Sequence, residues 1–332
     1  MKLPKFLQVN ENDSEEEKKK KKFLLILFPI ICLLIVIGII LAILFGVRGC
    51  SSNGNNDNSP TPKLSEDGKT ITYGLYPQTN VDDSDLVSAL NTLTTPESNG
   101  WYLYDDEYYA KLSATPNNSN YTFDNGTTIV SGTTYWFKCE PITWNVLSNN
   151  NGKYYILSSV LLDAHRYNEY YDGIKDGHYA NNYQYSEIRA WLNDDFYNSA
   201  FALGNSYIQT TTVDNSASTT SSSDNPYVSD NTFDKVFLPS YQDYINTNYG
   251  FDTTIFETNT RSCKTTDWAR ARGAYYSKES PTLYNDYYWT RSPINHANFY
   301  LASYVSSDGG LYGDNVGYTY QGVRPALTIK IA

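Results

Sequence analysis

The sequence has 332 residues, of which 40% are hydrophobic, 18% charged and 15% aromatic, a composition typical of a globular rather than a disordered or fibrous protein. The formal net charge of −11 argues against a general nucleic-acid binder, because such proteins carry a basic surface. Four Cys are too few for a small disulfide-stapled protein, and a chain of this length can build a sizeable hydrophobic core.

The N-terminal part of the chain has the pattern of a membrane anchor. Residues 1–22 end in five consecutive lysines, and residues 23–47 carry no charge at all. A helix of 25 residues that rises about 1.5 Å per residue spans roughly 37 Å, enough to cross a hydrocarbon core of about 30 Å. The sequence therefore predicts a single-pass transmembrane helix at residues 23–47. Because lysines concentrate on the cytoplasmic side, we expect a cytoplasmic tail at residues 1–22 and an extracellular C-terminal domain at the cell membrane.

Cys50 leaves a second mode of attachment open. Residues 47–50 and the Ser/Asn-rich stretch after them resemble a bacterial lipoprotein cleavage site, although Arg48 fits it poorly and the apolar run is too long. Either mode attaches the product to a membrane. We interpret residues 48–68 as a flexible linker, because residues 51–62 contain no large apolar side chain.

Strand-like segments begin at residue 69. Residues 69–76, 133–148 and 152–162 are rich in Thr, Tyr, Val, Ile and Trp, and an Asn/Gly turn at 149–152 predicts a hairpin between the last two. Residues 81–130 are polar and turn-rich. We interpret them as an insertion on the domain surface with one short helix near its start, at residues 85–93.

Helices are few in the rest of the domain. Ser186 is the expected N-cap of the clearest helix, in which apolar residues from Ile188 to Phe196 recur at helical spacing and should bury Trp191. A second helix is expected at 266–274.

Strands return at the end of the chain, at residues 287–292, 299–305 and 323–331. We expect the last of them to lie beside residues 69–74, with Val323, Leu327 and Ile329 in the core. Strands outnumber helices without alternating regularly, which predicts an α+β domain over residues 69–332 with a mixed or antiparallel sheet and few helices.

Seven motifs follow one another along this domain. They are YGLYPQT (73–79), EPITWNVL (140–147), YSEIRAWLNDDFYNSAF (185–201), DKVFLPS (234–240), YYWTRSP (287–293), the Asp308-Gly309 turn and GVRPAL (322–327). The ordered set resembles an uncharacterised bacterial domain of unknown function with W-x-V-L, S-x-I-R-x-W-L-N, W-x-R-S-P and G-V-R-P-A-L motifs, over residues 73–332. The C-terminal W-x-R-S…G-V-R pattern is similar, more distantly, to the C-type-lectin-like fold of formylglycine-generating and sulfatase-modifying proteins. The resemblance implies a C-type-lectin-like domain without an established activity.

The sequence contains no recognisable motif of a catalytic site. Formylglycine-generating enzymes need a close pair of C-terminal cysteines, whereas no cysteine follows Cys263. The three histidines, His165, His178 and His296, lack metal-binding spacing, and no G-x-S-x-G motif occurs. The acidic segments 105–107 and 308–314 offer oxygen ligands but match no defined calcium loop. We therefore expect no catalytic residue set, no metal site and no cofactor.

Two pairs of alternatives stay open for residues within the domain. Cys139 and Cys263 form either one disulfide, which an extracellular compartment permits, or two separate buried thiols. Three arginines, Arg189, Arg291 and Arg324, either clamp an anionic ligand or tie carbonyls and carboxylates together, and we favour the structural role.

Two functions of different classes compete. We expect a membrane-anchored extracellular binding or adhesion module for a glycan or a surface protein, because a membrane anchor, a flexible linker and a Tyr-rich domain suit display. The 32 tyrosines either form binding surfaces, since each combines an apolar ring with a hydrogen-bonding tip, or reflect the overall composition of the chain. The alternative is a cell-surface enzyme, which a pocket joining His165 or His296 to a carboxylate and a hydroxyl would favour. The binding face is expected on loops near Trp289, Arg291, Tyr318 and Tyr320, with Tyr287-Tyr288 and Tyr312 as further exposed tyrosines.

Overall fold

The computed structural model describes residues 61–170, 173–279, 283–295 and 299–331. Residues 57–332 form one compact unit. The predicted cytoplasmic tail, the transmembrane helix at 23–47 and Cys50 lie outside the described residues. Within the described part of the chain, no helix is long and apolar enough to span a bilayer.

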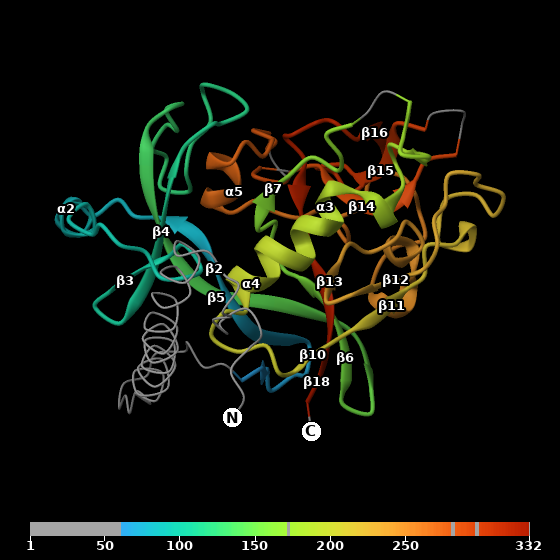
Figure 1. The fold of residues 1–332 in the computed structure, drawn as a ribbon, viewed down its shortest axis with the longest axis horizontal. Coiled ribbons are helices and arrows are strands. Elements are labelled where there is room, and N and C mark those ends of the chain that lie inside the picture. Colours follow the sequence, from blue (N-terminus) through green and yellow to red (C-terminus); the bar gives the residue numbers. More distant parts are fainter. Residues whose placement is uncertain (1–60, 171–172, 280–282, 296–298, 332) are drawn as a thin grey trace, which may run out of the picture. The chain divides into compact units, whose positions relative to one another are not determined.

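A nine-stranded antiparallel sheet forms the larger layer (Figure 1). Its strands run in the order β1-β2-β5-β6-β18-β10, while β13 pairs with β18, and β4 joins β3 to β5. They are β1 (Lys63–Leu64), β2 (Thr70–Asn80), β3 (Tyr102–Tyr104), β4 (Glu107–Ser113), β5 (Thr134–Asn150), β6 (Lys153–Ser158), β10 (Ile208–Gln209), β13 (Val236–Phe237) and β18 (Ala326–Lys330). The predicted hairpin at 149–152 is confirmed, because Asn151 and Gly152 both take positive φ between β5 and β6.

The predicted position of the last strand was wrong. β18 pairs with β6 on one side and with β10 and β13 on the other, so β5 and β6 separate it from β2. Val323, Leu327 and Ile329 are buried as expected, but Arg324, Ala326 and Thr328 are buried too. The segment 322–331 is not one strand, because residues 322–323 pair in a different sheet, and residues 326–329 of β18 are buried on both of its faces.

A second sheet has the order β16-β15-β14-β17-β7, in which β14 and β17 run parallel and the other pairs antiparallel. Its strands are β7 (Asp163–Ala164), β14 (Tyr288–Pro293), β15 (Leu301–Val305), β16 (Leu311–Asn315) and β17 (Gly322–Val323). Two small hairpin-like pairs complete the described strands: β8 (Ile174–Lys175) with β9 (His178–Tyr179), and β11 (Thr211–Val213) with β12 (Thr232–Asp234).

The helices of the described residues are short. They are α2 (Ser84–Leu90), η2 (Tyr183–Tyr185), α3 (Glu187–Trp191), the π-helical η3 (Leu192–Phe196), α4 (Tyr197–Ala200), η4 (Ala217–Thr219), η5 (Asp243–Ile245), η6 (Thr247–Tyr249) and α5 (Asp267–Ala271). The predicted N-cap is confirmed, since the Ser186 hydroxyl accepts from the Arg189 backbone N–H. Thr266 caps α5 in the same way. The domain is thus mainly sheet with few helices, as the α+β prediction required.

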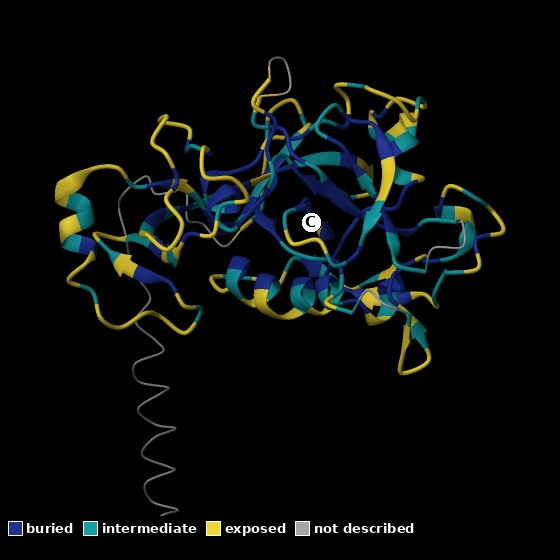
Figure 2. Cartoon of the chain, turned by 90° about the horizontal axis from the view of Figure 1, so that it is seen from above, coloured by how far each residue is buried: buried dark blue, intermediate teal, exposed yellow. Residues whose placement is uncertain are grey.

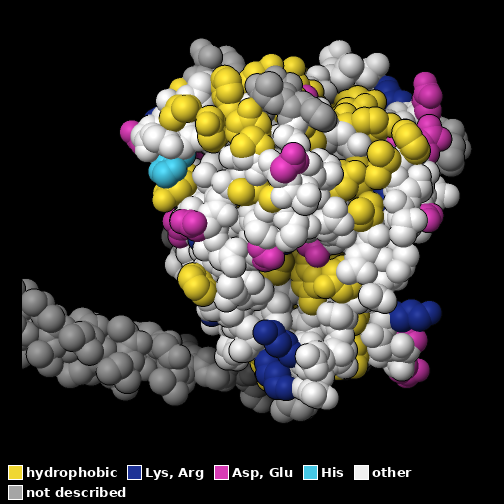
Figure 3. All heavy atoms as spheres, turned by 90° about the vertical axis from the view of Figure 1, so that its right-hand side faces the viewer, with side chains coloured by type: hydrophobic (Ala, Val, Ile, Leu, Met, Phe, Trp, Pro, Cys, Tyr) yellow, Lys and Arg dark blue, Asp and Glu magenta, His cyan; other side chains and the backbone are white. Residues whose placement is uncertain are grey.

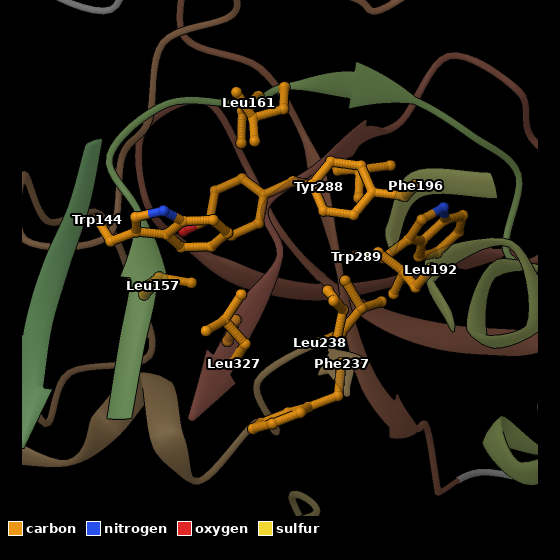
Figure 4. Packing of buried hydrophobic residues seen from close by; sticks show 14 of the residues in the cluster. Trp144, Leu157, Leu161, Leu192, Phe196, Phe237, Leu238, Tyr288, Trp289 and Leu327 are labelled. Carbon is orange, nitrogen blue, oxygen red and sulfur yellow. The ribbon is translucent and has the colours of Figure 1, made fainter. Parts of the chain in front are cut away.

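The core lies between the sheets and the α3–η3–α4 segment. Trp144, Tyr288 and Trp289 are among its largest fully buried side chains, and Figure 4 shows them packed with leucines from β6, β18, η3 and connecting segments. Buried residues concentrate in the strands, while exposed residues follow the outer loops (Figure 2). Trp191 was predicted to be buried but is only partly so, because its ring lies at the rim against His165 and Phe196.

The segment 81–130, interpreted as a surface insertion, is tied to the domain by β4, which pairs with β5 over five residues, and by a second apolar cluster that includes Phe123 and Tyr276. Within the predicted linker 48–68, β1 pairs with β2. Ordered sheet structure therefore begins before residue 69.

Candidate functional site

The β15–β16 hairpin presents two tyrosines side by side. Tyr304 and Tyr312 are register partners, with ring centroids 6.0 Å apart. The chain reverses between them through Gly309, which has a φ of +87°. A Cβ added at Gly309 would lie 2.0 Å from the Thr258 carbonyl oxygen, so only glycine fits there. The buried Arg261 donates from Nε to the Gly309 carbonyl oxygen at 2.6 Å, which fixes the turn.

Three further tyrosines extend this pair into a row of five that we call the tyrosine track: Tyr121, Tyr275, Tyr287, Tyr304 and Tyr312. Successive ring centroids are 6.4, 4.5, 5.5 and 6.0 Å apart, within the range at which aromatic rings attract one another. Tyr121 is buried, the next three are partly buried, and Tyr312 is 45% exposed. The track therefore rises from the interior to the molecular surface. Figure 3 shows hydrophobic side chains, tyrosines included, gathered toward the top, the side at which Figure 1 places β15 and β16.

A polar pocket of about 830 Å³ is lined by Tyr121 and Tyr275 of the track and by residues 307 and 308 of the β15–β16 turn. This volume is in the range of small-molecule binding sites. The lining residues are aromatic, amide, hydroxyl and charged: Asn118, Asn120, Tyr121, Glu257, Thr258, Asn259, Tyr275, Tyr276, Ser277, Lys278, Glu279, Ser307 and Asp308. Since Tyr121 and Tyr275 belong both to the pocket and to the track, the two form one continuous surface.

Asp314 lies beside the track on β16. It is two residues from Tyr312 and therefore on the same face of the strand. Its Oδ2 accepts from Gln321 Nε2 at 2.7 Å and from the Tyr320 hydroxyl at 3.3 Å. Partial burial raises the pKa of Asp314 above its ordinary value, a shift that hydrogen bonds from Asn315, Gln321 and Tyr320 oppose.

The predicted Tyr318 and Tyr320 stack on each other near Asp314, with centroids 5.0 Å apart. Tyr318 is 43% exposed and Tyr320 is partly buried. The Tyr320 carbonyl oxygen accepts from the Tyr275 backbone N–H at 2.9 Å, which joins this pair to the track. These two predicted residues thus belong to the candidate site.

Trp289 and Arg291, by contrast, do not belong to the candidate site. Trp289 is fully buried, and its indole N–H donates to the His165 carbonyl oxygen at 3.0 Å. Arg291 is buried and donates to the carbonyl oxygens of Asp214 and Leu238 and to the Asp243 carboxylate. Both residues were predicted on exposed loops, but β14 places them in the interior, because it lies between β15 and β17. Tyr288 on the same strand is fully buried as well.

The other arginines of the motifs also have structural roles, as we favoured. Arg189 pairs with the buried Asp234 at 2.7 Å. Arg324 donates to the carbonyl oxygens of Ser158 and Arg261 and to the Tyr288 hydroxyl.

The described histidines and cysteines form no catalytic arrangement that we recognise. His165 stacks on Trp191 at 4.9 Å, its Nδ1 is 2.7 Å from the Arg166 carbonyl oxygen, and its Nε2 is 3.9 Å from Glu187. His178 stacks on a tyrosine, and His296 lies outside the described residues. No group of three His, Cys, Asp or Glu that could hold a metal occurs in the described part of the chain. Cys139 and Cys263 are free, buried thiols, so the structure has the second of our two alternatives and not the disulfide.

Sequence reasoning missed Tyr121, Tyr275, Tyr304 and Gln321, and it named Asp314 only as the end of the acidic segment 308–314. For Tyr304 a signal was present: Tyr304 and Tyr312 each lie four residues from Asp308, so a hairpin turning there pairs them. No local pattern connects Tyr121 or Tyr275 to this hairpin, because they reach it through contacts between segments far apart in sequence.

The family model of a domain of unknown function (DUF6273) matches residues 151–331, and the chain belongs to this family. The match includes the motifs from YSEIRAWLN to GVRPAL, whereas those at 73–79 and 140–147 precede it. No curated protein and no solved structure was found to match the chain.

Proposed function

We propose that this member of the DUF6273 family is a membrane-anchored extracellular module that binds a glycan along the tyrosine track and in the adjoining pocket. The observation that supports this most directly is the continuity of aromatic rings from a pocket of about 830 Å³ to the exposed Tyr312. A continuous row of binding positions suits an extended ligand better than a compact metabolite.

The chemistry of the lining fits a sugar chain. Tyrosine offers a rigid apolar face with a hydroxyl at its tip, and the apolar faces of sugar rings stack on such surfaces. Asn118, Asn120 and Asn259 can both donate to and accept from hydroxyl groups, and Asp308 can accept from them. The site therefore combines ring stacking with the hydrogen bonding that a polyhydroxylated ligand needs.

The proposed location and fold support the same function. A transmembrane helix at residues 23–47 and the polar stretch after it would hold the domain outside the cell and away from the bilayer. A C-type-lectin-like fold, which the C-terminal motifs suggest, is compatible with ligand binding on loops. Weak affinity at a single site would suffice, because many copies on one membrane raise the effective concentration of sites.

A glycan array probed with the full-length protein in detergent micelles tests the proposal. We expect binding by the native protein and a loss of about 3- to 10-fold in Tyr312→Ala, since a ring contact contributes roughly 0.5–1.5 kcal/mol. The matched control is Tyr185→Ala, which removes another exposed tyrosine, 53% exposed, that stacks on His178 outside the track. Absence of glycan binding by the native protein, or equal losses in the two variants, would refute the proposal.

A further inference from the structure

We infer that Asp314 recognises hydroxyl groups of the ligand and that the site selects neutral glycans over acidic ones. This inference rests on the proposed glycan binding and adds a specificity residue and a ligand class to it.

The position of Asp314 fits a ligand bound on the track. Tyr312 and Asp314 project to the same face of β16, and Tyr304 lies opposite Tyr312 on β15. A sugar ring stacked on Tyr304 or Tyr312 would therefore have the Asp314 carboxylate next to it. Stacking fixes the plane of the sugar ring, and a carboxylate at its edge would then fix the direction in which its hydroxyls point.

The hydrogen bonds of Asp314 leave room for such a ligand. A carboxylate has about four acceptor positions. The Asn315 N–H occupies one on Oδ1 at 2.9 Å, and Gln321 and Tyr320 occupy those on Oδ2. Gln321 is fully buried, and the hydrogen bond from its Nε2 holds the Asp314 carboxylate in place. One position on Oδ1 remains for a donor from outside the protein.

Charge favours a neutral ligand. Asp314 forms no ion pair with a described Lys, Arg or His. The pocket lining adds three carboxylates, Glu257, Glu279 and Asp308, against the one ammonium group of Lys278. A uronate or sialate would bring a further negative charge to this surface, whereas the hydroxyls of a neutral sugar would donate to it.

This arrangement makes binding depend on pH. Among the described residues, the titratable groups near Asp314 are the hydroxyls of Tyr304 on β15, Tyr312 on β16 and Tyr320 before β17. Burial raises the pKa of Tyr304 to about 12 and also raises the pKa of Tyr320 above its ordinary value. Asp314 is the one carboxylate in this group, and partial burial raises its pKa above the ordinary value. Protonation removes acceptor capacity from its carboxylate, so ligand affinity should fall as the pH drops through the pKa of Asp314.

The test compares the full-length protein with Asp314→Asn on arrays of neutral oligosaccharides and of oligosaccharides containing uronate or sialate. We expect the native protein to prefer the neutral set and to bind it less at pH 4 than at pH 7. Asp314→Asn, which keeps the shape of the side chain, should bind it about tenfold less at pH 7 and show a flatter pH profile. Asp194→Asn, at an exposed carboxylate on η3, is the matched control and should bind as the native protein does.

The outcomes separate the two proposals. If Tyr312→Ala weakens binding but Asp314→Asn does not, the role of Asp314 is refuted while glycan binding stands. A preference for acidic glycans, or loss of binding in EDTA that Ca²⁺ restores, would also overturn the role of Asp314 proposed here. If the native protein binds no glycan of either set, the proposed function fails, and the role of Asp314 fails with it.

Discussion

Tyr275 and Tyr287 stack almost face to face, with ring centroids 4.5 Å apart and an interplanar angle of 11°. Tyr275 follows α5 and lines the pocket, whereas Tyr287 directly precedes β14 in the second sheet. Their contact therefore joins the pocket to the track. The hydrogen bond from the Tyr275 N–H to the Tyr320 carbonyl oxygen fastens the same segment to the loop before β17.

This contact predicts different effects for two substitutions of one residue. Tyr287→Phe keeps the ring and should retain glycan affinity within about twofold, while Tyr287→Ala interrupts the track and should reduce affinity about tenfold. Isothermal titration of the purified protein with an array-selected glycan measures both. If Phe and Ala weaken binding equally, the hydroxyl rather than the stacked ring would be the important group.

Among the residues that the sequence predicted for the binding face, the tyrosines lie in the candidate site, whereas Trp289 and Arg291 are buried elsewhere. Tyr312, Tyr318 and Tyr320 follow a turn that the Asp308-Gly309 pair predicts, and residues close to a short hairpin lie near the surface. Trp289 and Arg291 share a motif with polar neighbours, and the local pattern does not reveal that β14 is enclosed between two other strands. Burial of that kind depends on sheet order, which contacts distant in sequence determine.

The same reasoning explains the strands. β5, β6 and the turn between them follow from β-branched and aromatic residues around an Asn-Gly pair, a local signal. The partners of β18 do not follow from a local signal. Leu327 pairs with Ile156 and Val236, and apolar alternation alone would fit pairing with β2 as well. Pairing between distant strands is therefore the part of the fold that the sequence leaves open.

The two tryptophans predict a ranking of stability. Trp289→Ala removes a fully buried ring and leaves the His165 carbonyl oxygen without its donor, so it should cost about 3–5 kcal/mol of unfolding free energy. Trp191→Ala removes a partly buried ring and should cost less, roughly 1–2 kcal/mol. Urea denaturation of residues 57–332 followed by circular dichroism measures the difference. An equal or reversed ranking would contradict the packing described here.

The buried thiols predict that reducing agents leave the stability of the domain unchanged. Residues 57–332 contain Cys139 and Cys263 as their only cysteines, and both thiols are free. The midpoint of thermal unfolding should therefore be the same with and without dithiothreitol. Titration with a thiol reagent should find two reactive groups in the denaturant-unfolded chain and almost none in the folded one, because burial raises the pKa of both thiols. A midpoint that falls on reduction would indicate a disulfide instead.

Asp286 predicts a pH-dependent stability. It is fully buried, its Oδ2 has no hydrogen-bond partner among the residues that the structure describes, and burial raises its pKa well above the ordinary value. The unfolded chain loses this proton near pH 4, whereas the folded domain resists losing it, so this residue's contribution to stability should fall as the pH rises above about 4. Asp286→Asn has a similar shape, which matters because Gly322 leaves little space beside Oδ2, and it cannot ionise.

We therefore expect Asp286→Asn in residues 57–332 to gain stability relative to the native sequence as the pH increases from 4 to 8, measured by urea denaturation at several pH values. The comparison between the two proteins cancels the titration of groups that they share. Asp230→Asn, at an exposed carboxylate, is the control and should shift stability by a similar small amount at every pH. If the difference between Asp286→Asn and the native domain is constant across this range, Asp286 is ionised in the folded state, and the unpartnered Oδ2 must be solvated in solution.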